Sequence, residues 1–351
     1  MRSVSPLPST SDVISQLRLP LIVLVTYAHS YSAVPSDYRL LTSGWDTLEV
    51  LRLLVSQTMV KVVVPVFFII SGYLFFARME RWSLRLWRDK MLRRARSLLI
   101  PYVAWNLVMA AKLQHFSLSM LWNYWPQAGQ QTDWLGGDNW MTAPANLPLW
   151  FLRDLMVVSL FTPVIYWLLS RRMGGVVMAV LLVVYLSGVG AFALPGLSVC
   201  SVFFFSLGAW VAIRRRRLVD EALRMEKPAY VLSAVLAGAM VLSYHTQVFS
   251  SLMLAFRLTG AVAVFCLAYR VLSATRYRIP PAVAASSYFV YLAHFVLFFS
   301  FLDRFMLGTL GVSPAVHYLC APLLKALLLV AVYRLFRISD STELNSSRLN
   351  R

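Results

Sequence analysis

Apolar segments long enough to cross a lipid bilayer recur along this sequence from residue 14 to residue 336. Hydrophobic residues make up 59% of the 351 residues and charged residues only 14%, and the mean hydropathy is +0.66. A crossing helix needs about 20 apolar residues, and lipid forces every backbone amide to pair within its own helix. The sequence therefore predicts an all-α, polytopic integral membrane protein. The apolar segments are continuous and do not alternate with polar residues, which argues against a β-barrel.

Apolar windows bounded by helix breakers predict about ten transmembrane helices. The predicted segments are 14–33, 54–77, 97–113, 148–169, 174–193, 198–213, 229–247, 252–273, 282–302 and 315–336. We expect a transmembrane domain over 14–336, between an N-terminal tail of residues 1–13 and a C-terminal tail of residues 337–351. The N-terminal tail lacks the charged region and short apolar region of a cleaved signal, so the first helix is expected to stay attached.

The basic residues gather at the ends of the apolar segments. Residues 78–96 contain eight Lys and Arg against two acidic residues, and further basic stretches occupy 170–173, 214–217, 274–278 and the C-terminal tail. With ten helices all of these fall on one side, and the positive-inside rule then places both termini in the cytoplasm. A net charge of +18 would suggest nucleic acid in a soluble protein, but topology explains it here, and we expect no nucleic-acid partner.

The three cysteines, Cys200, Cys266 and Cys320, all lie within apolar stretches. Their odd number gives no disulfide framework, and their spacing is not that of a zinc site, so we expect no metal. They are interpreted as small core residues.

Two of the predicted outer loops are long. Residues 34–53 carry several charges, and residues 114–147 are rich in Trp, Gln, Asn, Gly and Asp. Aromatic, amide and carboxylate side chains together suit the stacking and hydrogen bonding of a sugar. An interfacial aromatic belt is the alternative interpretation of the second loop.

His29 follows the apolar core of the first predicted helix, about 22 Å from its start at residue 14. Ionisable residues at such a depth are costly and mark functional sites by default. A neutral imidazole there could act as a general base for a hydroxyl nucleophile. The alternative is an interfacial histidine that is hydrogen-bonded to a neighbouring helix. Arg18 begins the same helix, eleven residues earlier, and could point inward or extend to the lipid headgroups.

His294 lies near the middle of the ninth predicted helix, with Ser287 and Tyr291 seven and three residues earlier on the same face. Such a polar stripe should face a cavity or another helix. His294 could hold substrate or orient His29, and a structural hydrogen bond between helices is the alternative.

Arginines at the start of the third predicted helix could bind phosphate. Arg93 and Arg96 are three residues apart, which makes them neighbours on a helix surface, and guanidinium groups bind phosphate bidentately. The alternative is that they only set topology. In the second helix, Ser71 and Gly72 form a small pair that would let another helix or a thin ligand approach the backbone.

Taken together, these motifs resemble the acyltransferase-3 family, the multi-span membrane O-acyltransferases of surface polysaccharides. The matching elements are Arg18 with His29 and Ser30, "FFIISGYLFF" at 67–76, "RRARSLLIPY" at 93–102, "LWFLRDL" at 149–155 and "SSYFVYLAHF" at 286–295. They occur in the family's order over about residues 14–336. Pro20 departs from the small residue expected after the first arginine, which puts a role for Arg18 in question. A fused hydrolase-like domain, present in some relatives, has no counterpart within these residues.

The resemblance implies an enzyme that transfers an acyl group, usually acetyl, from cytoplasmic acyl-CoA to a hydroxyl of a polysaccharide or lipid-linked sugar. The acceptor would be modified at the periplasmic side of the bacterial inner membrane. Acyl-CoA is then a co-substrate, and no permanently bound cofactor is implied. His29 is implied as the catalytic residue, through general-base chemistry or a transient acyl-histidine, and Arg93, Arg96 and Arg18 as donor-binding residues. We expect a cavity between the first, second, fourth and ninth helices, lined by Ser30, Ser71, Tyr73, Trp150, Tyr291 and His294.

Two other classes fit parts of the pattern. A multi-span transporter or flippase of a lipid-linked sugar would also need a polar cavity and intramembrane histidines, but no CoA. The one-sided arginine cluster and the lack of an internal repeat argue against it. The membrane-bound O-acyltransferases fit less well, because their usual histidine lies late in the chain.

Overall fold

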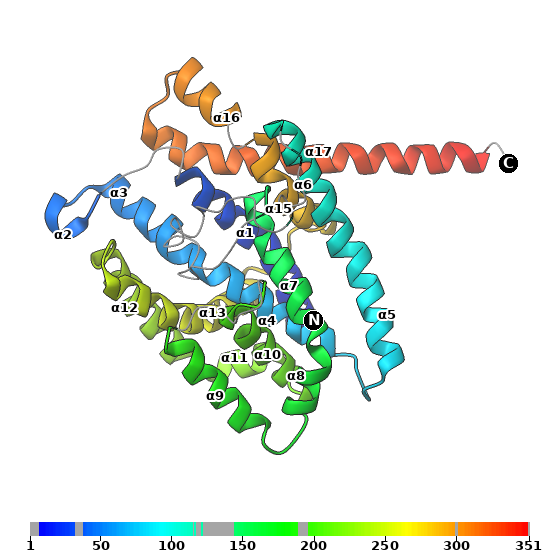
Figure 1. Cartoon of the computed structure of the whole chain (residues 1–351). Helices are drawn as coiled ribbons and strands as arrows, with labels where there is room; N and C mark the ends of the chain where they lie inside the picture. The colour runs from blue at the N-terminus through cyan, green and yellow to red at the C-terminus, as the bar shows by residue number, and fades with distance from the viewer. Residues whose placement is uncertain are drawn as a thin grey trace, which may run out of the picture.

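The computed structural model describes residues 7–31, 38–114, 116, 121, 144–188, 196–298 and 301–349, and in these residues every regular element is a helix (Figure 1). The predicted all-α class is therefore confirmed for the described part of the chain. The longer helices are α1 (Thr10–Tyr31), α4 (Val63–Phe76), α5 (Leu84–Arg94), α6 (Ile100–Leu113), α7 (Trp150–Leu160), α8 (Thr162–Leu169), α9 (Gly174–Leu186), α10 (Val199–Ile213), α12 (Glu226–Leu242), α13 (Gln247–Thr275), α15 (Ser287–Phe298) and α17 (Pro314–Leu349).

Shorter elements connect or extend these helices. They are α2 (Leu40–Ser43), α3 (Thr47–Arg52), α11 (Leu218–Arg224), α14 (Pro281–Ala284) and α16 (Phe301–Arg304), together with π-helical turns at Leu53–Thr58, Ala95–Leu99 and Phe305–Thr309 and 3₁₀ turns at Met59–Val62 and Leu147–Leu149.

Length and apolar composition identify four to seven candidate membrane spans among the described helices. Four helical segments qualify alone: Thr10–Ser30, Thr47–Phe76, Gln247–Thr275 and Pro314–Arg337. Three bent pairs qualify if each pair is one span: Leu147–Leu160 with Thr162–Leu169, Leu218–Arg224 with Glu226–Leu242, and Ser287–Leu297 with Phe301–Thr309. A protein with this many apolar helices is a multi-pass membrane protein.

The structure corrects several predicted boundaries. The second apolar helix begins at Thr47 rather than at residue 54, so the loop before it is shorter than expected. The basic connection 78–96 is not a loop, because it contains α5. Ser83 caps this helix by accepting a hydrogen bond from the Leu86 amide at 3.2 Å. A side-chain oxygen at that position satisfies an amide that has no partner within the helix.

The fourth predicted helix is bent by 59° between α7 and α8. Pro163 follows the bend, and proline cannot donate to the carbonyl four residues earlier, which belongs to Ser159. The hydroxyl of Thr162 donates to that carbonyl instead, at 2.7 Å. The freed backbone group is thus satisfied inside the protein, as the membrane interior requires.

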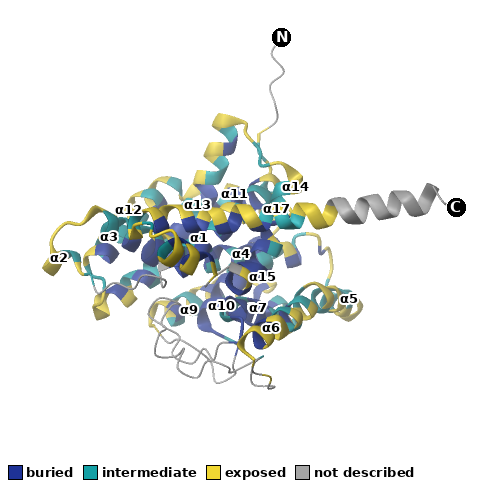
Figure 2. Ribbon diagram, turned by 90° about the horizontal axis from the view of Figure 1, so that it is seen from above, coloured by how far each residue is buried: buried dark blue, intermediate teal, exposed yellow. Residues whose placement is uncertain are grey.

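The tightest helix contact joins α4 to α10. A Cβ atom added to Gly72 would lie 2.0 Å from the Phe205 carbonyl oxygen, and one added to Gly208 would lie 2.0 Å from that of Ile69. Only glycine permits this approach of two backbones. Helix packing therefore explains Gly72 in the small pair of the second helix. Buried residues gather around α4, α7, α10 and α15 in the middle of the molecule (Figure 2).

Candidate active site

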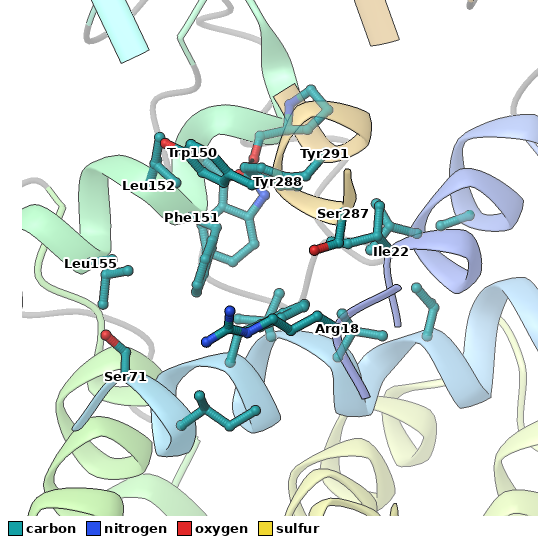
Figure 3. A pocket seen from close by; sticks show the side chains of 18 of the residues that line it. Arg18, Ile22, Ser71, Trp150, Phe151, Leu152, Leu155, Ser287, Tyr288 and Tyr291 are labelled. Atoms are coloured by element: carbon teal, nitrogen blue, oxygen red, sulfur yellow. Dashed lines mark hydrogen bonds between the residues drawn. The ribbon is translucent and has the colours of Figure 1, made fainter. Parts of the chain in front are cut away.

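A cavity of about 390 Å³ lies among α1, α4, α7 and α15 (Figure 3). These helices correspond to the first, second, fourth and ninth predicted helices, the four that were expected to form it. Most of the lining is aliphatic or aromatic, with few polar groups. Such a site buries a thin apolar ligand and orients it through a small number of polar contacts.

The cavity extends along α1, because Arg18 and His29 both line it. Eleven residues separate them, which is about 16 Å along a helix. In Figure 3 the guanidinium group of Arg18 points into the cavity, on the side where Ser71 of α4 lies. We call the region of Arg18 and Ser71 the arginine end and the region of His29 the histidine end.

Arg94 contacts the arginine end through Ser71. Its guanidinium group donates to the Ser71 hydroxyl at 3.0 Å and to the Ser71 carbonyl at 3.3 Å, and it also donates to the Ser159 hydroxyl. The same group lies 4.9 Å from the centre of the Phe75 ring. Sequence reasoning missed this contact, because it treated Arg94 as one more topogenic charge.

Arg93 and Arg96 are exposed, and neither is among the described residues that line the cavity. They belong to the same basic stretch as Arg94. Lys90, one turn before, is partly buried, and burial lowers the pKa of its ammonium group to about 8, with the charges of Arg94 and Arg93 acting in the same direction. Positive charge is therefore crowded at this surface, and a bound anion would relieve it.

At the histidine end, the His29 ring lies between two other rings. Its centre is 5.2 Å from the centre of the His294 ring and 5.2 Å from that of Phe295. His29 and His294 are both buried, with exposed fractions of 5% and 2%. The structure thus brings together two histidines that are far apart in the sequence.

The hydrogen bonds of His294 define its tautomer. Its Nδ1 lies 2.8 Å from the Tyr291 carbonyl oxygen and 3.2 Å from that of Val290. A carbonyl oxygen only accepts, so Nδ1 carries the hydrogen and neutral His294 has its lone pair on Nε2. Among the residues that the structure describes, that buried Nε2 has no hydrogen-bond partner.

A buried ionic cluster lies next to His29, and sequence reasoning missed it. Lys325 of α17 donates to both carboxylate oxygens of Asp303, at 2.7 and 2.9 Å, and reaches the Ser30 hydroxyl at 3.4 Å. His317 Nε2 lies 2.8 Å from Asp303 Oδ1. A Lys inside an apolar segment was the available signal, since such residues are rare in spans.

The other expected cavity residues divide into two groups. Trp150 and Tyr291 line the cavity, and the Tyr291 hydroxyl donates to the Pro148 carbonyl at 2.6 Å. Ser30 and Tyr73 are not among the described lining residues: Ser30 meets Lys325, and Tyr73 packs against the main apolar core.

Two further cations line the cavity without having been predicted. Lys61, in the 3₁₀ turn before α4, and Arg257, in α13, each have an exposed fraction of 5%. Each is a single cation within an apolar segment, whereas the topology argument considered only the charges between these segments. They add positive charge to the cavity wall.

Some sequence expectations concern other parts of the chain. Most of the loop 114–147, proposed to contact a sugar, lies outside the described residues. Within the described residues, no group of three His, Cys, Asp or Glu side chains is arranged to hold a metal ion.

Comparisons with known proteins define the class. The profile of the acyltransferase-3 family, described as an acyltransferase domain, matches residues 13–333. The chain therefore belongs to this family of membrane enzymes, which transfer acyl groups other than aminoacyl groups.

One curated relative is the succinoglycan biosynthesis protein ExoH of Rhizobium meliloti (strain 1021), which is 29% identical over 174 residues. The match covers 46% of this chain and 44% of that protein, so it spans less than half of the relative's length. No solved structure matches the chain.

Proposed function

We propose that the protein is a membrane O-acyltransferase that moves an acyl group, acetyl in the simplest case, from cytoplasmic acyl-CoA to a hydroxyl of a polysaccharide or lipid-linked sugar. In this proposal the chain crosses the bacterial inner membrane about ten times with both termini in the cytoplasm. The arginine end then faces the cytoplasm and the histidine end faces the periplasm. The name of the curated relative supports a polysaccharide acceptor.

The observation that carries the proposal is a cavity with a cation toward one end and a buried histidine toward the other. The distance of about 16 Å between Arg18 and His29 along α1 is comparable with the pantetheine arm of CoA, roughly 15–20 Å. That arm is thin and uncharged, which suits the apolar lining. The phosphates stay at the arginine end, where Arg18 points into the cavity, and Arg93 and Arg96 are exposed on the basic stretch that also contains Arg94.

In the proposed reaction, His29 removes the proton of the acceptor hydroxyl while its oxygen attacks the thioester carbonyl. The carbon–oxygen bond forms, the carbon–sulfur bond breaks, and the proton passes from His29 to the leaving CoA thiolate. Base catalysis of this kind contributes about 10²–10⁴ in rate. A transient acyl-histidine is the competing route.

The test is incubation of the purified protein with radiolabelled acetyl-CoA and total cell-envelope glycans. We expect label in the glycan fraction together with release of free CoA, and neither when the H29A variant is used. A wild-type protein that neither labels glycan nor consumes acyl-CoA, with acetyl-CoA or a longer acyl-CoA, would instead support a carrier of lipid-linked sugars.

A further inference from the structure

His294 occupies the position of an orienting partner behind His29. It touches the His29 ring but is not among the described residues that line the cavity, whereas His29 is. A substrate in the cavity therefore meets His29, and His294 acts on the reaction only through His29. In enzymes with a histidine base, the group behind the ring fixes which nitrogen carries the hydrogen.

The chemistry of His294 suits that position. Its Nδ1–H is held by two carbonyl groups of its own helix, so the lone pair is on Nε2, a buried atom without a hydrogen-bond partner in the described part of the chain. A buried acceptor without a donor is costly, unless a donor reaches it in the working enzyme. A separation of 5.2 Å between ring centres allows two facing ring nitrogens to come within about 2.6–3.2 Å of each other once the His29 ring rotates.

Three other described groups close to His29 differ from His294 in what they offer. Phe295 has no polar atom. The ammonium group of Lys325 is only a donor, and the carboxylate of Asp303 is already engaged by Lys325 and His317.

We propose that His294 is the positioning residue for His29: its Nε2 accepts the N–H of His29, so that the other nitrogen of His29 presents its lone pair to the cavity. The inference rests on the proposed function and deepens it. A chain of hydrogen bonds then runs from the acceptor hydroxyl through His29 and His294 to the Tyr291 carbonyl. When His29 takes the hydroxyl proton, Nε2 of His294 and the carbonyl behind it stabilise the resulting imidazolium, and the proton then goes to the CoA thiolate.

Three substitutions of His294 separate this role from a structural one. Glutamine places an amide oxygen near the position of Nε2, so H294Q keeps the acceptor toward His29. Asparagine places its amide near the position of Nδ1, so H294N keeps the bond within the helix and loses the acceptor. Leucine, in H294L, removes both. The hydrogen bonds of Nδ1 in the described part of the chain stay within α15, so these variants break no hydrogen bond between helices there.

The first measurement is acetyl transfer to cell-envelope glycan. We expect H294N and H294L to lower kcat by about 10²-fold or more with an unchanged KM for acetyl-CoA, and H294Q to retain most of the activity. F295L is the matched control, because Phe295 lies at the same 5.2 Å from the His29 ring and provides packing alone. Equal activity of H294N and H294Q, or wild-type kcat in H294L, would overturn the inference.

The second measurement does not depend on acyl transfer. Diethyl pyrocarbonate modifies the unprotonated nitrogen of histidine, and mass spectrometry follows its reaction with His29. We expect the modification of His29 to be slower in H294N and H294L than in the wild type and in H294Q. If all four proteins react equally fast, His294 does not orient His29, even where transfer is active. If the rates differ as expected but the wild type transfers no acyl group, the proposed function fails and the histidine pair stands.

Discussion

The ionisable side chains near the two ends of the cavity differ in their exposure and in their partners. Next to the arginine end, but outside the described cavity lining, Arg93 and Arg96 are exposed, and Arg94 is held by two serine hydroxyls and the Phe75 ring. Next to the histidine end, the ionisable groups Lys325, Asp303 and His317 are buried and bonded to one another in one cluster. Exposed charges are suited to capture a large anionic ligand and release it. Buried groups with fixed partners are suited to hold one geometry during a reaction.

Replacement of His29 tests the histidine end most directly. We expect H29A to lose 10²-fold to 10⁴-fold or more in the rate of transfer, about the contribution of a general base, and to keep its unfolding temperature. The measurement is glycan labelling from radiolabelled acetyl-CoA, together with thermal unfolding in detergent.

The matched control for this variant is H245N, since His245 lies outside the cavity and asparagine tolerates its positive φ of 64°. A correctly inserted H29A protein that transfers acetyl at the wild-type rate contradicts the assignment.

The buried cluster should make the histidine end sensitive to single changes of charge. We expect D303N or K325M alone to destabilise the protein by about 3–5 kcal/mol, because each leaves an uncompensated buried charge. The double variant D303N/K325M should recover most of this loss. Chemical unfolding in detergent measures the three free energies.

The pair of Arg270 with Glu226, whose side chains are 61% and 15% exposed, provides the comparison, and E226Q should lower the free energy of unfolding much less than D303N or K325M does. A double variant as unstable as the worse single variant would show that the cluster does not act as an ion pair.

The arginine end should respond through ligand affinity rather than stability. We expect R93A and R96A to weaken acetyl-CoA binding by about tenfold, the value of one lost charge-assisted hydrogen bond, at unchanged stability. R81A removes another exposed arginine of the same basic connection and is the control. Equal affinity in all three variants, measured by calorimetry, would show that Arg93 and Arg96 do not bind the donor and only set the topology.

Ligand binding itself should be visible as a gain in stability. At a concentration of 100 Kd, acetyl-CoA should stabilise the wild type by about 2.7 kcal/mol, as mass action requires of a specific ligand. Thermal unfolding with and without acetyl-CoA measures the shift, and inorganic phosphate serves as a control for non-specific anions. A shift that is equal for phosphate and acetyl-CoA would mean that the site does not recognise the pantetheine arm.

Much of the fold follows from the sequence, because apolar segments and their breakers are local signals. The apolar helices lie close to the predicted segments, and the errors fall at positions such as Thr47 and Pro163, where helix starts and bends depend on packing. α5 was missed because its composition is too polar for a span, and the span criterion says nothing about an exposed helix.

The candidate site was predictable only where the signal was a residue type at a given depth. His29, Arg18 and Ser71 lie in the cavity, as their place in the apolar segments indicated. The importance of Arg94 was not predictable, because successive residues of a helix point in different directions and the sequence does not say which direction is inward. Likewise, the pairing of Lys325 with Asp303 depends on how α17 packs against α16.

The backbone contact between α4 and α10 has a consequence for the choice of donor. The contact lies directly behind the part of α4 that carries Ser71, so this part of α4 has no space into which it can move. Room for a bulkier acyl chain must therefore come from side chains in the lining, where the rings of Phe67 of α4 and Phe151 of α7 lie 5.9 Å apart. The range of acyl groups that the enzyme accepts would then depend on the rotamers of two phenylalanines rather than on the separation of its helices.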